Sequence, residues 1–522
     1  MIKSFLNSKS KTIVSAAVIL GAASLISRAL GLVRDRMLAG TFGAGDELDI
    51  YYAAFRIPDL VYSLLVLGAI SAGFIPVFIG YLKKNKEKSW YLANNLLNIL
   101  VLSLIVICSI LIIFTPWLIK LIAPGFSSEK ISSTVQLARI MFLSPFFLGL
   151  SAIFGGILQS FRRFLVYSLS PIMYNLGIIF GVLFLVKPFG LLGLAYGVVL
   201  GAFLHMIIQI PTAYLCGFRW QPVFDFKFDG IKRVFKMMPP RIVSLFLYQA
   251  NIIIMTIIAS FLAVGSIAIY NLSFNIMSFP IGIFGVSFSL ASFPKLSESA
   301  QKEDKDSFVK IFSLTLRQIL FFSLLVSVLF FVLRTQIVKI ILRTGNFDMG
   351  DILLTSQTLA YFSLGIFAQA LILLFLRGFF AWENTKIPLL TCLLSTLLTV
   401  FLAFIFVGPL GVAGLALALS VSSLFHLFLL FIFLKNRIGF LDEKNIFTSG
   451  IKMLISSLIA GLVTYISLEI LTLWLNSDTI SVILIQTIIA SLVGILVYLF
   501  SVWLFKLEEL KIFLSKLYGS KH

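Results

Sequence analysis

Ionised side chains inside apolar stretches are the residues of this sequence best able to do chemistry. An ionised group in hydrocarbon costs several kcal/mol unless it faces water or a partner, so it marks either a functional site or a defined pairing. Such groups concentrate near the start of the chain. They are Arg28, Arg34, Asp35, Asp49, Arg56 and Asp59.

Arg28 is the residue in this group that points most clearly to a ligand. It lies several residues inside the first apolar run, and no carboxylate lies within one helical turn of it. A guanidinium can hold a phosphate through two parallel hydrogen bonds. We therefore expect Arg28 to contact an anionic ligand such as a phosphate. For the other charges a structural network is the alternative, in which Arg34 pairs with Asp49 and Arg56 pairs with Asp59.

Pro58 adds a backbone feature to the same region, since it separates Arg56 from Asp59. Proline removes a hydrogen bond from the helix ladder and frees a carbonyl. Interrupted helices of this kind bind substrates and ions in membrane transporters. This part of the chain is therefore the expected functional region.

No arrangement typical of an enzyme is present. The sequence contains no phosphate-binding glycine loop of the kind that binds ATP, and no paired carboxylates or clustered metal ligands. The three cysteines, at positions 108, 216 and 392, lie far apart in apolar runs and form neither a disulfide framework nor a metal site. We expect no catalytic residue, no metal and no cofactor. His205 and His426 are expected to be packing residues, with a proton relay as the alternative.

Composition limits what kind of protein can position these groups. Of 522 residues, 60% are hydrophobic and 12% are charged, against roughly a quarter charged in ordinary soluble proteins. A water-soluble surface cannot be built from this composition. The net charge of +19 is typical of nucleic-acid binding in a soluble protein, but basic loops that orient membrane spans explain it here. We therefore expect no nucleic-acid partner.

The elements that hold the charged groups are predicted to be membrane-spanning helices. About 14 stretches reach the roughly 20 apolar residues that a spanning helix needs. Their long, unalternating apolar runs favour helices over barrel strands. Loops on the side of the N-terminus carry about 26 Lys and Arg, against about 8 on the other side, which places both termini in the cytoplasm.

An internal repeat divides the predicted helices. The segment 188–195 reappears at 409–416, and 50–57 matches 269–276, at offsets of 221 and 219 positions. An even number of spans per repeat predicts two parallel six-helix lobes around a central cavity, with two extra helices at the C-terminus. The predicted domains are 1–217, then 218–440, which opens with an amphipathic segment on the membrane surface, and finally 441–522, which ends in an amphipathic cytoplasmic tail.

Several motifs resemble those of the MurJ (MviN) family of lipid II flippases, part of the multidrug/oligosaccharidyl-lipid/polysaccharide exporter superfamily. The resemblance covers nearly the whole chain, and its N-terminal motif is specific to the family. The matching motifs are SRALGLVRD at 27–35, FGAG at 42–45, GAISAGFIPVF at 68–78, APGF at 123–126, FPIGIFGVSF at 279–288 and GNFD at 345–348.

The resemblance implies a function and roles for the charged residues. Family members move an undecaprenyl-pyrophosphate-linked peptidoglycan precursor, lipid II, from the inner to the outer leaflet of the bacterial cytoplasmic membrane by alternating access. The headgroup enters a cationic cavity, and the lipid tail follows a groove contributed by the last two spans. Arg28 would contact the pyrophosphate. Arg34 and Asp49 would hold an outer gate, and Asp35 and Asp59 belong to the same gate or structural network.

The chain also departs from the family pattern at cavity positions. Many members carry two arginines where this sequence has Tyr62 and Ser63, and an Asp-Arg pair where it has Phe274 and Asn275. Recognition of the pyrophosphate would then rest on three side chains. They are Arg28, Arg56 and Asn275.

Three alternative functions remain at this level. One is a Wzx-like flippase for another polyprenyl-linked oligosaccharide, one is an ion-coupled drug exporter, and one is a non-transporting scaffold for cell-wall synthesis. On the leading hypothesis the partners are lipid II, membrane lipids and proteins of cell-wall synthesis and division. We expect the chain to act as a monomer.

Overall fold

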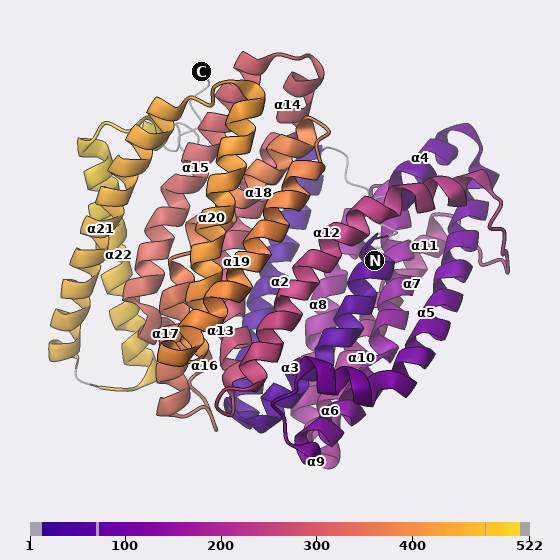
Figure 1. Ribbon diagram of the computed structural model, residues 1–522, viewed down its shortest axis with the longest axis horizontal. Coiled ribbons are helices and arrows are strands. Elements are labelled where there is room, and N and C mark those ends of the chain that lie inside the picture. Colours follow the sequence, from indigo (N-terminus) through magenta and orange to yellow (C-terminus); the bar gives the residue numbers. More distant parts are fainter. Residues whose placement is uncertain (1–12, 69–72, 476, 512–522) are drawn as a thin grey trace. The chain divides into compact units, whose positions relative to one another are not determined.

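The computed structural model describes residues 13–68, 73–475 and 477–511. Within these ranges the chain is helical, with short π-helical stretches and no β-strand (Figure 1). The all-α prediction is confirmed. The chain divides into two compact units, Met1–Ala268 and Ile269–His522. The predicted lobes and C-terminal extension, with boundaries at 217 and 440, stay a prediction.

The two longest helices of the first unit, α5 and α12, pack against each other. Most of the other helices of this unit pack on α8 or α10. A cluster of buried apolar side chains from α3, α5, α7 and the start of α12 forms its core. The elements are α2 (Ile13–Phe42), α3 (Asp46–Val61), η1 (Tyr62–Leu67), α4 (Ile75–Lys84), α5 (Lys86–Ile122), α6 (Ser128–Met141), α7 (Leu143–Ser160), α8 (Phe164–Phe180), η3 (Gly181–Leu185), α9 (Val186–Phe189), α10 (Leu192–Ile207), α11 (Ile210–Leu215) and α12 (Asp229–Ser260).

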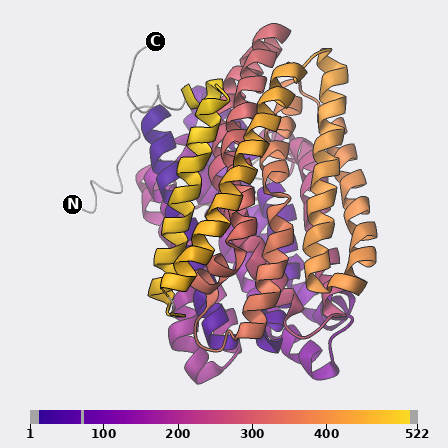
Figure 2. The same ribbon diagram turned by 90° about the vertical axis from the view of Figure 1, so that its left-hand side faces the viewer.

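The second unit places its last two helices against its centre. Helices α21 and α22 pack side by side, α21 also packs on α15, and both are seen in yellow in Figure 2. The elements are α13 (Ser266–Pro280), η4 (Ile281–Val286), α14 (Ser287–Gln301), α15 (Lys305–Val332), α16 (Arg334–Leu342), α17 (Met349–Ser363), α18 (Ile366–Ala381), α19 (Lys386–Leu410), α20 (Val412–Ile438), α21 (Glu443–Trp474) and α22 (Ile480–Leu504).

Local backbone structure repeats between the units at the offsets found in the sequence. The π-helical stretch Tyr62–Leu67 corresponds to Ile281–Val286, 219 positions later. Gly190 (φ 58°, ψ −141°) corresponds to Gly411 (φ 56°, ψ −135°), 221 positions later. Both glycines have a positive φ, which a residue with a Cβ adopts only at a cost. These shared turns support an internal repeat.

Twelve helical segments of the described chain are long and apolar enough to cross a membrane, or thirteen if the bent pair α17 and α18 forms one span. Helix α2 is not among them, although its first 18 residues carry Arg28 as their only charged side chain. Adding it would give the predicted fourteen spans. The multi-pass membrane architecture is therefore confirmed, while the count of fourteen stays a prediction.

The segment between α11 and α12 is only partly the predicted amphipathic helix. Residues 218–228 form an extended strap without regular helix, and α12 begins at Asp229. From there Ile231 and Val234 are buried while Lys232, Arg233, Phe235 and Lys236 are exposed, so the amphipathic pattern applies to the first turns of α12. The predicted amphipathic character of the C-terminal tail falls mostly on residues 512–522, outside the described residues.

Candidate functional site

Arg28 lines a cavity inside the first unit. The cavity has a volume of about 630 Å³, and its walls come from α2, η1, α4, α7, α8 and α10. Hydroxyl and amide groups supply most of its polarity, and no carboxylate is among its lining residues. The polar lining residues are Ser24, Ser27, Arg28, Tyr62, Ser151, Gln159, Tyr167, Ser168, His205 and Gln209. A cavity with a guanidinium and no carboxylate suits an anionic or hydroxyl-rich ligand.

A hydrogen-bonded cluster forms one wall of this cavity. Ser151 Oγ lies 2.6 Å from His205 Nδ1, and Gln209 Nε2 donates both to Ser151 Oγ (2.5 Å) and to the His205 carbonyl (3.1 Å). Gln209 is fully buried, and its Oε1 has no hydrogen-bond partner among the described residues. His205 is therefore more than an apolar packing residue, because it organises polar side chains at the cavity.

Arg34 is part of a clamp between α2 and α8. Its Nε and NH2 donate to Asp35 at 3.0 and 2.8 Å, and its NH1 donates to Asn175 Oδ1 at 3.2 Å. Asn175 in turn donates to the Ser27 carbonyl at 3.2 Å. The predicted pairing of Arg34 with Asp49 is wrong, because Arg34 takes the adjacent carboxylate of Asp35, which is 2% exposed.

Asp49 connects three separate elements of the first unit. Its carboxylate forms an ion pair with Lys130 Nζ (3.0 Å) and accepts hydrogen bonds from the backbone amides of Gly265 and Ala268, both at 2.9 Å. Lys130 also pairs with Asp46 at 2.6 Å. Asp49 thus ties α3 to α6 and to the segment from Gly265 into the first turn of α13. Lys130 carries no sequence signal for this role, because it lies 81 positions from Asp49 in a polar segment.

Two glycines allow the close packing around this junction. A Cβ on Gly265, whose φ is +86°, would lie 1.8 Å from the Ala44 carbonyl oxygen. A Cβ on Gly125 would lie 2.1 Å from the Ser260 carbonyl oxygen. Gly125 belongs to the APGF motif. The motif needs glycine at this position because the α5–α6 loop lies too close to the end of α12 for a side chain.

Arg56 is bound to α12. Its Nε donates to Thr256 Oγ1 at 2.8 Å. Tertiary packing of α12 thus brings a hydroxyl acceptor to Arg56, a residue that is 9% exposed. The predicted Arg56–Asp59 pairing stays a prediction.

Ser63 shows how the chain uses a position where many family members carry arginine. Gln249 Nε2 donates to Ser63 Oγ at 2.6 Å, which links the π-helical stretch η1 to α12. An uncharged side-chain hydrogen bond therefore occupies this position. Asn275, the other residue at a departing position, lies half-buried on α13 in the second unit, and its part in binding stays a prediction.

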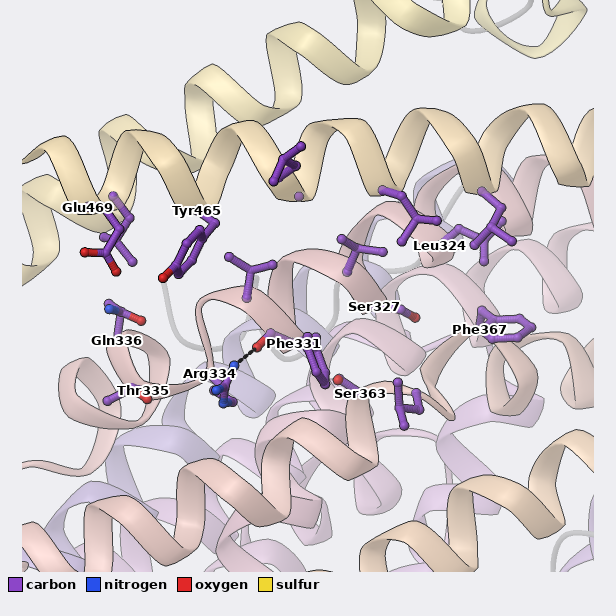
Figure 3. Close-up of a pocket in the computed structure, with 18 residues that line it drawn as sticks. Leu324, Ser327, Phe331, Arg334, Thr335, Gln336, Ser363, Phe367, Tyr465 and Glu469 are labelled. Atoms are coloured by element: carbon purple, nitrogen blue, oxygen red, sulfur yellow. Dashed lines mark hydrogen bonds between the residues drawn. The ribbon is translucent and has the colours of Figure 1, made fainter.

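The second unit contains an apolar groove between α15 and α21. Its volume is about 710 Å³, and leucine, valine and phenylalanine side chains line most of it. Figure 3 shows the polar side chains Arg334, Gln336, Tyr465 and Glu469 gathered towards one end, away from Leu324 and Phe367. Arg334 NH1 donates to the Phe331 carbonyl at 2.8 Å. The groove has the size and lining to hold an apolar chain, with a polar group at its end.

Comparison with known families decides the class of protein that carries these features. The family model described as "Lipid II flippase MurJ" matches residues 38–486. This chain belongs to the MurJ family. The match covers the helices that carry Asp49, Arg56, Asn275 and the groove, and it begins just after Arg28, Arg34 and Asp35.

Individual relatives agree with the family assignment. The chain is 30% identical over 460 residues to the "Probable lipid II flippase MurJ" of Buchnera aphidicola subsp. Acyrthosiphon pisum, which covers 86% of this chain and 89% of the relative. It is 26% identical to the "Lipid II flippase MurJ" of Burkholderia cenocepacia, covering 79% and 82%. The predicted family resemblance is confirmed.

Solved structures of related proteins share the fold. A structure titled "Lipid II flippase MurJ, inward closed conformation" matches with a TM-score of 0.78 and 26% identity, over 94% of this chain and 98% of that one. An inward-facing multidrug transporter of the MATE family matches with a TM-score of 0.65 and 14% identity, over 82% and 99%. The second match shows a common fold alone.

Proposed function

We propose that this chain is a lipid II flippase that carries the undecaprenyl-pyrophosphate-linked peptidoglycan precursor from the inner to the outer leaflet of the cytoplasmic membrane by alternating access. The observation that carries the proposal is the cavity around Arg28 in a member of the MurJ family. A guanidinium among hydroxyl and amide groups, without a carboxylate, suits a pyrophosphate that bears sugars. The family is one of transporters, so we assign the chain no catalytic role.

We propose that Arg28 contacts the pyrophosphate, because it lines the cavity directly. Arg56 and Asn275 are proposed as further contacts. Arg56 is anchored to α12 through the bond from its Nε to Thr256. Asn275 would contribute an amide, which binds phosphate oxygens more weakly than a guanidinium does.

We propose that the apolar groove between α15 and α21 takes the polyprenyl tail. A long isoprenoid chain needs an apolar path while its headgroup crosses the membrane. The groove supplies that path, and its lining includes Leu458 and Leu462 from α21. The tail would then stay in an apolar environment throughout transport.

We propose that the gate and the clamp are separate devices. Asp49 joins the start of α3 to the backbone amides of Gly265 and of Ala268 in the first turn of α13, so breaking these hydrogen bonds would free the junction between α12 and α13. Arg34 and Asp35 instead hold α2 against α8 within one unit. We assign Asp49 and Lys130 to the gate, and Arg34 and Asp35 to a structural clamp. Asp59, which is half-buried on α3 near Arg56, is assigned to the charge network around Arg56.

The membrane placement follows from the basic loops. We propose that both termini face the cytoplasm, because Lys83, Lys84, Lys86 and Lys88 all lie on the N-terminal side. We also propose the two six-helix lobes, a monomeric state and contacts with cell-wall synthesis and division proteins. Each of these rests on the sequence pattern and on the family.

Substitution of Arg28 tests the function. In vesicles that contain the purified protein, we expect Arg28→Ala to lower lipid II translocation at least tenfold, and Arg28→Lys to restore part of it, because lysine keeps the charge without the bidentate geometry. The measurement is the fraction of labelled lipid II that becomes accessible in the outer leaflet. The nearby Arg36→Ala is the control, since Arg36 does not line the cavity. Full activity of Arg28→Ala would contradict the proposal.

Native mass spectrometry separates the alternatives. A co-purifying pyrophosphate lipid with a pentapeptide supports lipid II as the cargo. Another polyprenyl-linked glycan in its place would favour the Wzx-like alternative. A scaffold without transport would tolerate Arg28→Ala in cells.

A further inference from the structure

A second apolar groove lies on the first unit, away from the Arg28 cavity. Its volume is about 450 Å³, and it is formed by α5, α7, α11 and the strap of residues 218–228. Asn98, Tyr214 and Trp220 are its polar members, and no acidic side chain lines it. The lining residues are Leu97, Asn98, Val101, Leu102, Ile105, Phe146, Leu150, Phe154, Ile210, Tyr214, Phe218, Trp220 and Phe224.

The strap that closes this groove is held by three asparagines of α5. Asn94 binds the backbone of Arg219 and Gln221, and Asn95 binds both the amide and the carbonyl of Asp225. Asn98 donates to two strap carbonyls and accepts from Trp220 Nε1 at 3.0 Å. The wall of the groove is therefore fixed in place, although the strap itself has no regular secondary structure.

The groove opens toward the bilayer. Leu102 and Ile105 are 46% and 49% exposed, and both lie within the membrane-spanning part of α5. With 37 residues, α5 is about 55 Å long and exceeds the roughly 30 Å of hydrocarbon. Its first turns, which carry the lysines, therefore stand in water. Trp220 then lies at the membrane–water interface, where tryptophan is enriched.

A cation lies at the edge of the groove. Arg219 is exposed, and its guanidinium lies 5.4 Å from the centre of the Tyr214 ring, which lines the groove. Its NH1 donates to the carbonyls of Tyr214 and Phe218 at 2.9 and 2.7 Å. Its Nε and NH2 have no hydrogen-bond partner among the described residues. The nearest acidic residue of the strap, Asp225, is engaged by Tyr91 and by backbone amides.

We propose that this groove binds an anionic phospholipid, with one acyl chain between α5 and α7 and the phosphate on Arg219. An apolar slot that opens to the bilayer needs an apolar chain. The exposed guanidinium beside it, with donors to spare, selects a lipid with net negative charge. This site is distinct from the Arg28 cavity and does not depend on the identity of the transported lipid.

Lipid binding to the purified full-length protein tests the proposal. Native mass spectrometry would compare phosphatidylglycerol with phosphatidylcholine of identical acyl chains. We expect phosphatidylglycerol to bind about fivefold more tightly, the factor typical of one basic residue at a membrane surface. Arg219→Gln should abolish this preference, and Arg219→Lys should keep part of it. Lys227→Gln is the matched control, because Lys227 is an exposed strap cation outside the groove, and it should keep the preference.

A second pair of variants tests the acyl chain. Leu102→Trp fills the groove and should weaken binding of both lipids several-fold. Ile110→Trp, at a position on the same helix that is 48% exposed but outside the groove, should leave binding unchanged. A preference that survives in Arg219→Gln, or that Lys227→Gln lowers equally, would overturn the phosphate contact. Unchanged binding in Leu102→Trp would overturn the groove. Arg219→Lys covers the case in which Arg219→Gln fails to fold.

Discussion

At the scale of single residues, the charged groups of α2 and α3 serve different purposes. Arg28 lines a cavity, whereas Arg34 and Asp35 join two helices of one unit. Asp49 accepts two backbone hydrogen bonds in addition to its ion pair with Lys130. A buried carboxylate with three donors is well satisfied, which explains how this charge persists while 2% exposed.

The Asp49 junction makes a prediction about stability. Asp49→Asn would lose the ion pair and leave one backbone amide without an acceptor, which costs about 1–3 kcal/mol. Lys130→Met would leave the buried carboxylate without its counter-ion, so we expect a loss at least as large. The measurement is the apparent melting temperature in detergent. The double variant should lose less than the two single losses added together, since both act on one interaction. Strict additivity would contradict the coupling.

At the scale of elements, short polar links join helices that are otherwise apolar. Asp478 lies in the turn between α21 and α22. It forms ion pairs with Lys339 at 2.9 Å and with Arg343 at 2.8 Å, which lie in the last turn of α16 and directly after it. These hydrogen bonds lower the pKa of Asp478 below its usual value. The turn is thus fixed to α16 on the same side of the second unit.

This link predicts a pH dependence. Because the folded pKa of Asp478 is lowered, its contribution is fully present above the unfolded pKa, about 3.9, and is lost as the pH falls through the folded value. At pH 7 we expect the free energy of unfolding of the wild-type protein to exceed that of Asp478→Asn. The difference should be less than about 1 kcal/mol, because the ion pair is exposed. The difference should shrink as the pH falls below about 3.9. A difference that grows towards low pH would contradict the assignment.

The groove between α15 and α21 makes a second prediction at this scale. Leu458→Trp would fill the proposed tail site, so we expect lipid II translocation to fall several-fold while the protein stays folded. Ile459→Trp is the control, because Ile459 is 41% exposed but does not line the groove. The vesicle translocation rate is the measurement, and equal rates for both variants would argue against the groove as the tail site.

At the scale of the whole molecule, two units carry matching local structure. The π-helical stretches and the glycine turns recur at offsets of 219 and 221. A repeat with an even number of spans keeps both copies in the same orientation.

Orientation in the membrane is the prediction that belongs to the whole molecule. In a variant without its three natural cysteines, Asn85→Cys should react with an impermeant thiol reagent only from the cytoplasmic side. Ser127→Cys, at the other end of α5, should react only from the outside. Labelling of intact cells compared with inverted vesicles gives the measurement. Reversal of the two results would place the termini outside.

The sequence by itself determined the class of structure, the membrane location and the family. Those follow from local quantities: the length of the apolar runs, the distribution of Lys and Arg, and motifs that are contiguous in the chain. It also singled out Arg28, because an arginine inside an apolar run is visible without any knowledge of its neighbours.

Only the tertiary structure decided which charges meet. Lys130 reaches Asp49 across 81 positions, and Thr256 reaches Arg56 across 200. Nothing local in the sequence encodes such contacts, so the predicted partner of Arg34 is wrong and the bond between Arg56 and Thr256 is not foreseen. The strap shows the same limit, because Asn94, Asn95 and Asn98 bind backbone groups more than 120 positions away. Partner choice depends on which helices pack together, and packing is a property of the whole fold.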